Sequence, residues 1–306
     1  MSQDLSIKEK QAAYHDHEAS TYEDKFRISY DDRCITYALD RFRKAVPEGK
    51  VFGRILEIGA GTGFFCVNLF LGEAIGGEVH VSDISPGMLE VCRRNAKEHG
   101  LDVVARVGDA EALPYDDDSF DLVIGHAFIH HLPVPGLALR EMARVLKPGG
   151  QLVIAGEPTE LGDRIATVVK RGSWRAFRAA TAAPGLRGLR RASIANSRDP
   201  ETAILAALEH EVDLHTFRPQ DVAHMADLAG LVDVRVITEE LTSNWWGWAA
   251  RTIEGSLRDG VVGYQWAMAM FNGYRALNWL DEKVLTHVVP DRFFYNLILT
   301  GTKPQA

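Results

Sequence analysis

The sequence is poor in cysteine and has no long apolar run. Its three cysteines, Cys34, Cys66 and Cys92, lie far apart and form no C-x-x-C pair. An odd number at such spacing argues against a disulfide framework or a structural zinc site and is typical of a reducing compartment. No apolar run approaches the ~18 residues of a membrane span, and the first residues are polar and charged, unlike a signal peptide. We therefore expect a cytoplasmic protein without a transmembrane segment.

Basic residues are also in the minority. Among 306 residues, 34 Lys and Arg stand against 42 Asp and Glu, which gives a net charge of -8. An acidic average argues against a general nucleic-acid-binding protein. Hydrophobic residues make up 46% of the chain, which is enough for a sizeable core. Extensive disorder is therefore not expected, and the length suits one large domain or two smaller ones.

Short apolar runs and helical patterns alternate between residues 54 and 156. Turn residues separate them: Ser85 and Pro86 are typical of a helix start, and Gly100 of a helix end. This alternation predicts an α/β fold with a parallel sheet and helices on both faces. The predicted strands are residues 54–60, 78–84, 103–107, 120–125 and 151–155, with later strands at 232–239 and 293–302, and the predicted helices are 86–99, 137–146 and 219–230.

After residue 156 the alternation breaks, and two insertions interrupt the late part of the sheet. Residues 164–198 hold nine Lys or Arg and no Asp or Glu, and residues 241–290 hold five of the six tryptophans. We predict six segments: an N-terminal helical lid (1–50), a cofactor-binding core (51–159), a basic helical insertion (160–215), a core helix and strand (216–240), an aromatic-rich helical lid over the acceptor (241–290) and a final core strand (291–306).

A glycine-rich turn follows the first predicted strand. Residues 57–63 read EIGAGTG, so a tight turn opens a helix whose free backbone amides favour an anionic group. The spacing is G-x-G-x-G and differs from the dinucleotide pattern G-x-G-x-x-G. Glu57 directly precedes the turn, where a carboxylate would repel a pyrophosphate but would suit a ligand ammonium group. The pattern therefore favours a ligand without phosphate.

Two further acids follow neighbouring strands. Asp83 ends the second strand and is placed to accept hydrogen bonds from both hydroxyls of a ribose. Asp109 ends the third strand and is placed to accept from the exocyclic amine of adenine. A ligand with a carboxylate, an ammonium group, a ribose and an adenine, but no phosphate, is S-adenosylmethionine.

Six motifs in a fixed order make the sequence resemble the class I S-adenosylmethionine-dependent methyltransferases of the small-molecule type (methyltransferase domain 11/25-like). They cover about a third of the chain: 56–63 (LEIGAGTG), 81–89 (VSDISPGML), 108–114 (GDAEALP), 119–124 (SFDLVI), 130–132 (HHL) and 144–150 (RVLKPGG). The resemblance implies a Rossmann-like sheet of seven mostly parallel strands whose last strand is antiparallel, with helices on both faces and helical lid insertions.

The resemblance also implies cofactor contacts. The glycine loop and the backbone of His126 would lie at the methionine end, Asp83 would hold the ribose, and Asp109 with the amide of Ala110 would contact the adenine edge. Ile84 and Met88 would enclose the adenine ring. In many relatives an early aromatic residue closes over the cofactor, and Tyr14 and Tyr22 occupy that region. The implied cofactor-binding residues are Tyr14, Tyr22, Glu57, Gly59, Ala60, Gly61, Asp83, Ile84, Met88, Asp109, Ala110 and His126.

Three histidines, His126, His130 and His131, follow the fourth strand, near the expected position of the methyl group. Imidazole changes charge near neutral pH, so each is a candidate catalytic base; packing within a shared family pattern is the alternative for each. Glu157 at the end of the fifth strand either orients an acceptor or caps the next segment. Residues 116–118 (DDD) predict a solvated turn, and no metal site is expected.

The two insertions have competing interpretations. The basic segment 164–198 is either a solvated helical pair or a surface for a transient anionic partner, such as an anionic substrate, a carrier protein or a membrane surface. The aromatic segment 241–290 predicts helices that pack against the sheet and also line an apolar acceptor pocket.

We therefore predict an enzyme that transfers a methyl group from S-adenosylmethionine to a hydrophobic small-molecule acceptor by in-line displacement. O-methylation is the first interpretation, and C-methylation of a quinone or lipid-like acceptor is the second. A module that binds the cofactor without catalysis and a nicotinamide-dependent oxidoreductase are alternatives from other classes; the glycine spacing opposes the oxidoreductase. The sequence leaves the acceptor and the oligomeric state open.

Overall fold

The computed structural model describes residues 6–26, 28–183, 185–190, 214–258 and 260–305. The chain divides into two compact units, of which unit 2 takes up most of the two predicted insertions. Unit 1 consists of Met1–Glu157, Leu205–Ile237 and Leu297–Ala306, and unit 2 consists of Pro158–Ile204 and Thr238–Asn296. Parts of the predicted segments lie outside the described residues: 1–5 and 27 of the N-terminal lid, 184 and 191–213 of the basic insertion, 259 of the aromatic lid, and 306 of the last strand segment.

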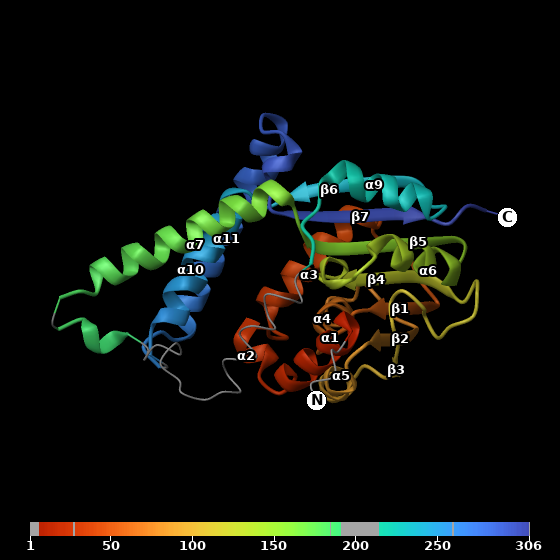
Figure 1. Ribbon diagram of the computed structural model, residues 1–306, viewed down its shortest axis with the longest axis horizontal. Helices are drawn as coiled ribbons and strands as arrows, with labels where there is room; N and C mark the ends of the chain where they lie inside the picture. Colours follow the sequence, from red (N-terminus) through yellow and green to blue (C-terminus); the bar gives the residue numbers. More distant parts are fainter. Residues whose placement is uncertain (1–5, 27, 184, 191–213, 259, 306) are drawn as a thin grey trace. The chain divides into compact units, whose positions relative to one another are not determined.

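Unit 1 is built on a seven-stranded sheet with the order β3-β2-β1-β4-β5-β7-β6 (Figure 1). β1 pairs in parallel with β2 and β4, β2 with β3, and β4 with β5. The predicted Rossmann-like, mostly parallel α/β fold is confirmed. The strands are β1 (Arg54–Ile58), β2 (Glu78–Asp83), β3 (Val103–Val107), β4 (Phe120–His126), β5 (Leu146–Pro158), β6 (Val232–Glu239) and β7 (Asn296–Thr302).

Helices cover both faces of this sheet, and each face has its own apolar core. Strand residues alternate between the two cores: Ile55 belongs to the core beneath α3, α4 and α5, and Leu56 belongs to the core beneath α6 and α9. The helices of unit 1 are α1 (Ile7–Glu18), α2 (Tyr22–Phe26), α3 (Asp32–Ala45), α4 (Phe64–Leu71), α5 (Pro86–Glu98), the short η1 (Ile129–His131), α6 (Pro135–Val145) and α9 (Pro219–Leu228).

The order of the strands reverses at β1: β2 and β3 lie on one side of it, and β4 and the later strands lie on the other. Ligands of open α/β sheets bind at such a switch point, outside the carboxyl ends of the strands. The predicted start of α5 is present there: the Ser85 hydroxyl accepts from the Met88 amide at 3.0 Å, and Pro86 occupies the first helical turn. The helix thus begins directly after the loop that ends β2.

The last strand, β7, runs antiparallel to β5, as the resemblance implied. The Gly149 amide donates to the Lys303 carbonyl and the Lys303 amide donates to the Gly150 carbonyl, both at 2.9 Å. Farther along, the Thr159 amide donates to the Tyr295 carbonyl at 2.7 Å, so the two segments run in opposite directions. This pairing makes β5 longer than the predicted strand 151–155 and includes residues that the sequence assigned to a turn.

Unit 2 is helical, and α10 lies beside both α7 and α11 (Figure 1). Asp281 is 1% exposed and holds the start of α10. Its carboxylate accepts from the backbone amides of Leu241, Thr242 and Ser243 and from the hydroxyls of the last two, at 2.6–3.0 Å. None of the helices within the described ranges is both long and apolar enough to span a bilayer. The main helices of unit 2 are α7 (Glu160–Ala180), α10 (Thr242–Ser256) and α11 (Tyr264–Lys283).

Candidate functional site

The glycine loop between β1 and α4 adopts left-handed backbone conformations. Gly59, Gly61 and Gly63 have φ angles of 62°, 51° and 89°, which favour glycine. A Cβ on Gly59 would lie 2.5 Å from Phe128, whereas a Cβ on Gly61 would meet no atom within 4 Å. The loop is therefore packed on its inner side and open beside Gly61, which leaves room for a ligand close to the backbone.

Glu57 lies buried beneath this loop. It is 1% exposed, and its Oε2 accepts from the Cys66 amide in the first turn of α4 at 3.1 Å. Burial, together with the nearby charge of Asp83, raises the pKa of Glu57 to about 8, although the hydrogen bond from Cys66 opposes this shift. A cationic group placed beside Glu57 would favour the ionised carboxylate.

Asp83 ties the glycine loop to the loop after β2. Its Oδ2 accepts from the Gly61 amide at 2.8 Å, and its Oδ1 accepts from the Ser85 amide at 2.9 Å. Burial raises the pKa of this carboxyl group, although both amides oppose that shift. A carboxylate has about four acceptor sites, so Asp83 has capacity for further donors beside the open face of Gly61. This arrangement fits a ribose that presents two hydroxyls.

Asp109, after β3, is engaged by the N-terminal helix. Lys8 of α1 lies 2.6 Å from Asp109 Oδ2 and 2.6 Å from Glu111 Oε2. Burial opposes the charge on Lys8, but both carboxylates together raise its pKa. The Asp109 side chain is 31% exposed, so this acid lies at the rim of the site, and a lysine contacts it on one oxygen.

Other residues of α1 contact the loops that follow β2 and β4. Gln11 donates to the His131 carbonyl. Asp16 Oδ1 accepts from the Ser85 hydroxyl at 2.5 Å and from the Gly87 amide at 2.8 Å. Together with Lys8, these bonds join α1 to three loops at the carboxyl end of the sheet. The predicted N-terminal lid segment therefore lies across the loops that carry the acids.

Several predicted cofactor residues belong to this N-terminal segment or to the loops that it contacts. Tyr14 is 4% exposed and its hydroxyl lies 3.1 Å from Lys25 Nζ. Tyr22 and Met88 belong to one apolar cluster, in which Met88 is 1% exposed. Three further predicted cofactor residues lie in these loops and differ in exposure. Ile84 is partly exposed, Ala110 is 8% exposed and Ala60 is 4% exposed.

His130 and Glu157 form a pair at the ends of β4 and β5. Glu157 is fully buried, and its Oε2 lies 2.8 Å from His130 Nδ1. The carboxylate also accepts from the amides of Phe128 and Ile129 at 2.8 and 3.0 Å. Burial works against its charge, yet His130 and these amides hold the pKa of Glu157 below its ordinary value. A carboxylate on Nδ1 selects the imidazole tautomer whose Nε2 carries the lone pair.

The other two candidate histidines have different surroundings. The His131 ring lies 4.0 Å from the His130 ring, and it makes an edge contact with His15 of α1 at 5.5 Å. The His126 ring lies among aromatic side chains, 5.1 Å from Phe64 and 5.4 Å from Phe65. His130 is hydrogen-bonded to a buried carboxylate, whereas the charge of His131 acts on the buried Asp83.

Sequence reasoning did not single out Lys8, Gln11, Asp16 or His15. They share α1 and lie more than sixty residues from their partners along the chain, so no local pattern marks them. Glu157 and His130 were each recognised as candidates, but the contact between them was not predicted.

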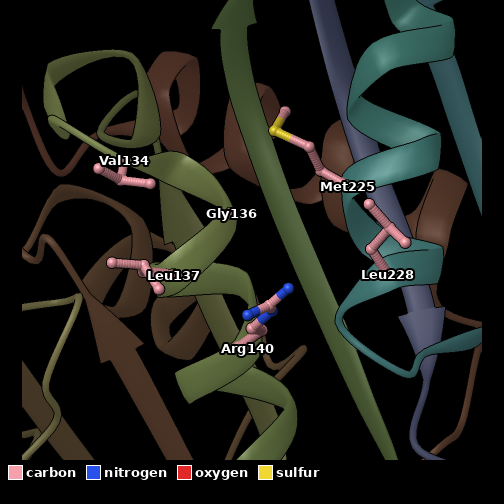
Figure 2. A pocket seen from close by; sticks show the side chains of 6 residues that line it. All are labelled: Val134, Gly136, Leu137, Arg140, Met225 and Leu228. Atoms are coloured by element: carbon pink, nitrogen blue, oxygen red, sulfur yellow. The ribbon is translucent and has the colours of Figure 1, made fainter.

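An apolar hollow of about 180 Å³ lies apart from these residues, between the start of α6 and α9 (Figure 2). Arg140 is its only charged lining residue. None of the predicted site residues lines it: the lining consists of Val134, Gly136, Leu137, Arg140, Met225 and Leu228.

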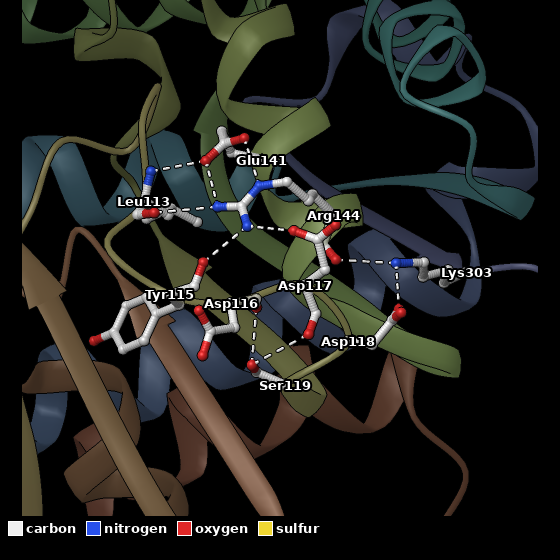
Figure 3. A network of polar contacts seen from close by, with 9 residues as sticks. All are labelled: Leu113, Tyr115, Asp116, Asp117, Asp118, Ser119, Glu141, Arg144 and Lys303. Atoms are coloured by element: carbon white, nitrogen blue, oxygen red, sulfur yellow. Dashed lines mark hydrogen bonds and ion pairs between the residues drawn. The ribbon is translucent and has the colours of Figure 1, made fainter.

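The acidic run 116–118 forms part of an ion network near the amino end of β4 (Figure 3). Arg144 pairs with Asp117 and Glu141 at 2.7 Å each, and Lys303 pairs with Asp118 at 2.7 Å. Within the described ranges, no group of three or more His, Cys, Asp or Glu residues is placed to hold a metal ion. These acids therefore connect the turn to α6 and to the residue after β7.

Comparison with known proteins gives consistent matches to the same part of the chain, which is less than half of its length. Residues 56–154 match a family model described as a methyltransferase domain. The chain is similar to the demethylmenaquinone methyltransferase of Clavibacter sepedonicus, with 46% identity over 102 residues that cover 33% of this chain and 40% of that protein. It is also similar to the 27-O-demethylrifamycin SV methyltransferase of Amycolatopsis mediterranei, with 34% identity over 145 residues, or 46% and 48% of the two chains. Each match spans less than half the length of the relative.

Among solved structures, the chain resembles the phosphoethanolamine N-methyltransferase 2 of Haemonchus contortus in complex with S-adenosyl-L-methionine. The TM-score is 0.58 at 17% identity, and the match covers 98% of this chain and 60% of that chain. At this identity the likeness concerns the fold alone.

Proposed function

We propose that the protein methylates a hydrophobic small molecule at an oxygen, because its residues 56–154 match a methyltransferase domain of the class I type that uses S-adenosylmethionine as its cofactor. His130 is the general base, and Glu157 is the positioning residue that orients it. The observation that carries the proposal is the 2.8 Å contact between His130 Nδ1 and the buried Glu157 carboxylate. Because the carboxylate binds Nδ1, the Nε2 atom carries the lone pair and can accept a proton.

The residues around the glycine loop fit the parts of the cofactor. Glu57 would face the ammonium group, Asp83 the ribose hydroxyls, and Asp109 the adenine edge, with the open backbone at Gly61 beside them. Ile84, Met88, the Ala110 amide, Gly59, Ala60 and the His126 backbone complete this set, and Tyr14 and Tyr22 cover it. When bound, S-adenosylmethionine supplies a methyl group activated on a sulfonium.

The chain has two tasks in this reaction. The loops and α1 align the reactants and exclude water, and alignment of this kind is worth ~7–11 kcal/mol. His130 takes the proton of the acceptor hydroxyl at Nε2 as the oxygen attacks. The buried Glu157 carboxylate then stabilises the imidazolium. A base of this kind contributes about 10²–10⁴-fold to the rate.

A second candidate is C-methylation of a quinone or lipid-like acceptor. It is favoured by the 46% identity to the demethylmenaquinone methyltransferase across the core motifs. The same base would then remove a proton from a ring carbon or from its hydroxyl neighbour. In either case the acceptor is a small molecule with a large apolar part.

The test is methyl transfer from labelled cofactor to a panel of phenols, aliphatic alcohols and quinones that lack a ring methyl. We expect His130→Gln to lower kcat by about 10²–10⁴-fold without changing the cofactor dissociation constant. Glu157→Gln should lower kcat less and move the acid limb of the pH–rate profile to lower pH, because an amide stabilises a protonated base less than a carboxylate does. His224→Gln, at an exposed histidine on α9, is the matched control.

The outcomes separate the alternatives. A normal kcat for His130→Gln would remove this residue from the mechanism. Labelling of the quinones alone would replace O-methylation by C-methylation. Tight cofactor binding without labelling of any acceptor, in the panel or in fractionated cell extract, would support a binding module without catalysis.

A further inference from the structure

One side of α7 carries a row of exposed arginines. Their spacings of seven, four and three residues bring them onto the same helical face. They are Arg164, Arg171, Arg175 and Arg178, and all four are exposed. In sequence this row opens the segment 164–198, which contains nine Lys or Arg and no acid, although the chain as a whole has a net charge of -8. Positive charge is therefore concentrated on one element of unit 2.

Apolar side chains lie exposed among these arginines. Val168, one turn after Arg164, is 69% exposed, and Trp174, next to Arg175, is 46% exposed. The Arg178 guanidinium lies 4.8 Å from the centre of the Trp174 ring. Beyond the end of α7, Leu186 is 44% exposed beside Arg187. This surface is therefore both cationic and apolar.

The opposite side of α7 is occupied within unit 2. Ala166 is fully buried, and Lys170 Nζ lies 3.3 Å from the centre of the Trp248 ring on α10. The arginine row therefore lies on the side of α7 that remains exposed to solvent, together with large parts of Val168 and Trp174.

We propose that this arginine row, with Val168, Trp174 and Leu186, binds the surface of a membrane that contains anionic phospholipids. Charge complementarity selects the anionic headgroups, and the interleaved apolar side chains gain by transfer into the interface between headgroups and acyl chains. A nucleic-acid backbone would neutralise the arginines but would give Val168 and Leu186 no apolar environment. The protein would lie on the membrane surface through this side of α7.

The proposal does not depend on the proposed chemistry, because the assay measures binding without methyl transfer. The full chain is sedimented with vesicles of phosphatidylcholine alone and of phosphatidylcholine with phosphatidylglycerol, at low and high salt. We expect binding to the anionic vesicles only, and weaker binding at high salt. Each cation at such a surface contributes about fivefold to binding, so Arg171→Glu with Arg175→Glu should weaken it by at least about 25-fold.

Two further variants make the test specific. Arg94→Glu with Lys97→Glu reverses two exposed cations on α5 in unit 1 and changes the net charge equally, so it should bind as the unmodified chain does. Trp174→Ala should weaken binding severalfold and leave its salt dependence unchanged. The proposal would be overturned if both double variants lost vesicle binding equally, if the chain bound neutral and anionic vesicles equally, or if it bound neither. Retention of single-stranded RNA in place of the vesicles would assign the surface to nucleic acid.

Discussion

Both units bury carboxylates, but they use them differently. In unit 2, Asp281 accepts five hydrogen bonds from the start of α10. In unit 1, Asp83 is held by the amides of Gly61 and Ser85 and faces the open side of the glycine loop. A carboxylate offers about four acceptor sites, so Asp281 is saturated by its own unit, whereas Asp83 keeps capacity for a ligand.

The contrast shows that burial alone does not identify a functional acid. A buried charge must be compensated, and the source of that compensation differs between the units. For Asp281 of unit 2 it comes from a helix terminus and has a structural effect. For Glu57 and Asp83 of unit 1 it is incomplete, and burial raises the pKa values of both groups. Raised pKa values beside an open loop are typical of binding sites.

The largest effect should come from Asp281→Ala. Loss of this cap leaves several donors unsatisfied, so we expect the free energy of unfolding of unit 2 to fall by about 3 kcal/mol. Tryptophan fluorescence during denaturation reports on this unit, because all six tryptophans belong to it. The exposed Asp291 provides a control, Asp291→Ala. If the free energy of unfolding falls by well below 1 kcal/mol, or if cofactor affinity falls as well, Asp281 does not have the purely structural role that distinguishes it from Asp83.

Asp83→Ala should act on the ligand. We expect cofactor affinity to fall by ~1–3 kcal/mol, because charge-assisted hydrogen bonds to the ribose are removed. Asp83→Asn retains one acceptor oxygen and should lose less. Isothermal titration measures both dissociation constants. If Asp83→Ala binds the cofactor normally, then Asp83, like Asp281, has only a structural role.

Glu57 should make the stability of unit 1 depend on pH. Its pKa of about 8 in the folded state exceeds the ordinary value of ~4.3, so the folded state holds the proton to higher pH than the unfolded state. The free energy of unfolding should therefore fall as pH rises, by about 2 kcal/mol between about pH 6 and 8. Cofactor affinity should rise over the same window, because a ligand ammonium favours the ionised form. Denaturation followed by circular dichroism measures the free energy of unfolding at each pH. Glu57→Gln should abolish both the pH dependence of stability and that of cofactor affinity. If stability in this variant still falls as pH rises, another group is responsible.

Lys8→Met should have the smallest effect. The ion pairs with Asp109 and Glu111 are partly exposed, so their loss costs about 1 kcal/mol or less, and Gln11 and Asp16 still hold α1. We expect the cofactor to dissociate a few times faster in stopped-flow measurements, because the helix covers the site less tightly. Lys97→Met, on the exposed side of α5, should leave the rate unchanged. Slower dissociation would mean that Lys8 competes with the adenine for Asp109.

Local patterns predicted most of the fold. The sequence placed β6 at its observed bounds and the start of α5 at Ser85, because strand periodicity and helix caps depend on neighbouring residues. It ended the helix before β5 at residues 147–150, but this stretch belongs to the strand. The difference arises because Lys303, far along the chain, pairs with Gly149 and Gly150.

The candidate site was predictable in part for the same reason. Glu57, Asp83 and Asp109 each end or flank a strand, so the topology brings them to one edge of the sheet. The His130–Glu157 contact and the Lys8–Asp109 ion pair could not be inferred, because they depend on how loops and α1 settle on that edge. Nothing in the spacing of residues 8 and 109 shows that they meet.

The position of β7 between β5 and β6 has a consequence for synthesis on the ribosome. β6 leaves the ribosome before β7, yet β7 is its neighbour in the sheet. Until β7 inserts, β5 and β6 each present an unpaired backbone edge, which is open to pairing with other chains. The ion pair of Lys303 with Asp118 also requires the residues after β7, so both edges stay open until that part of the chain has been synthesised.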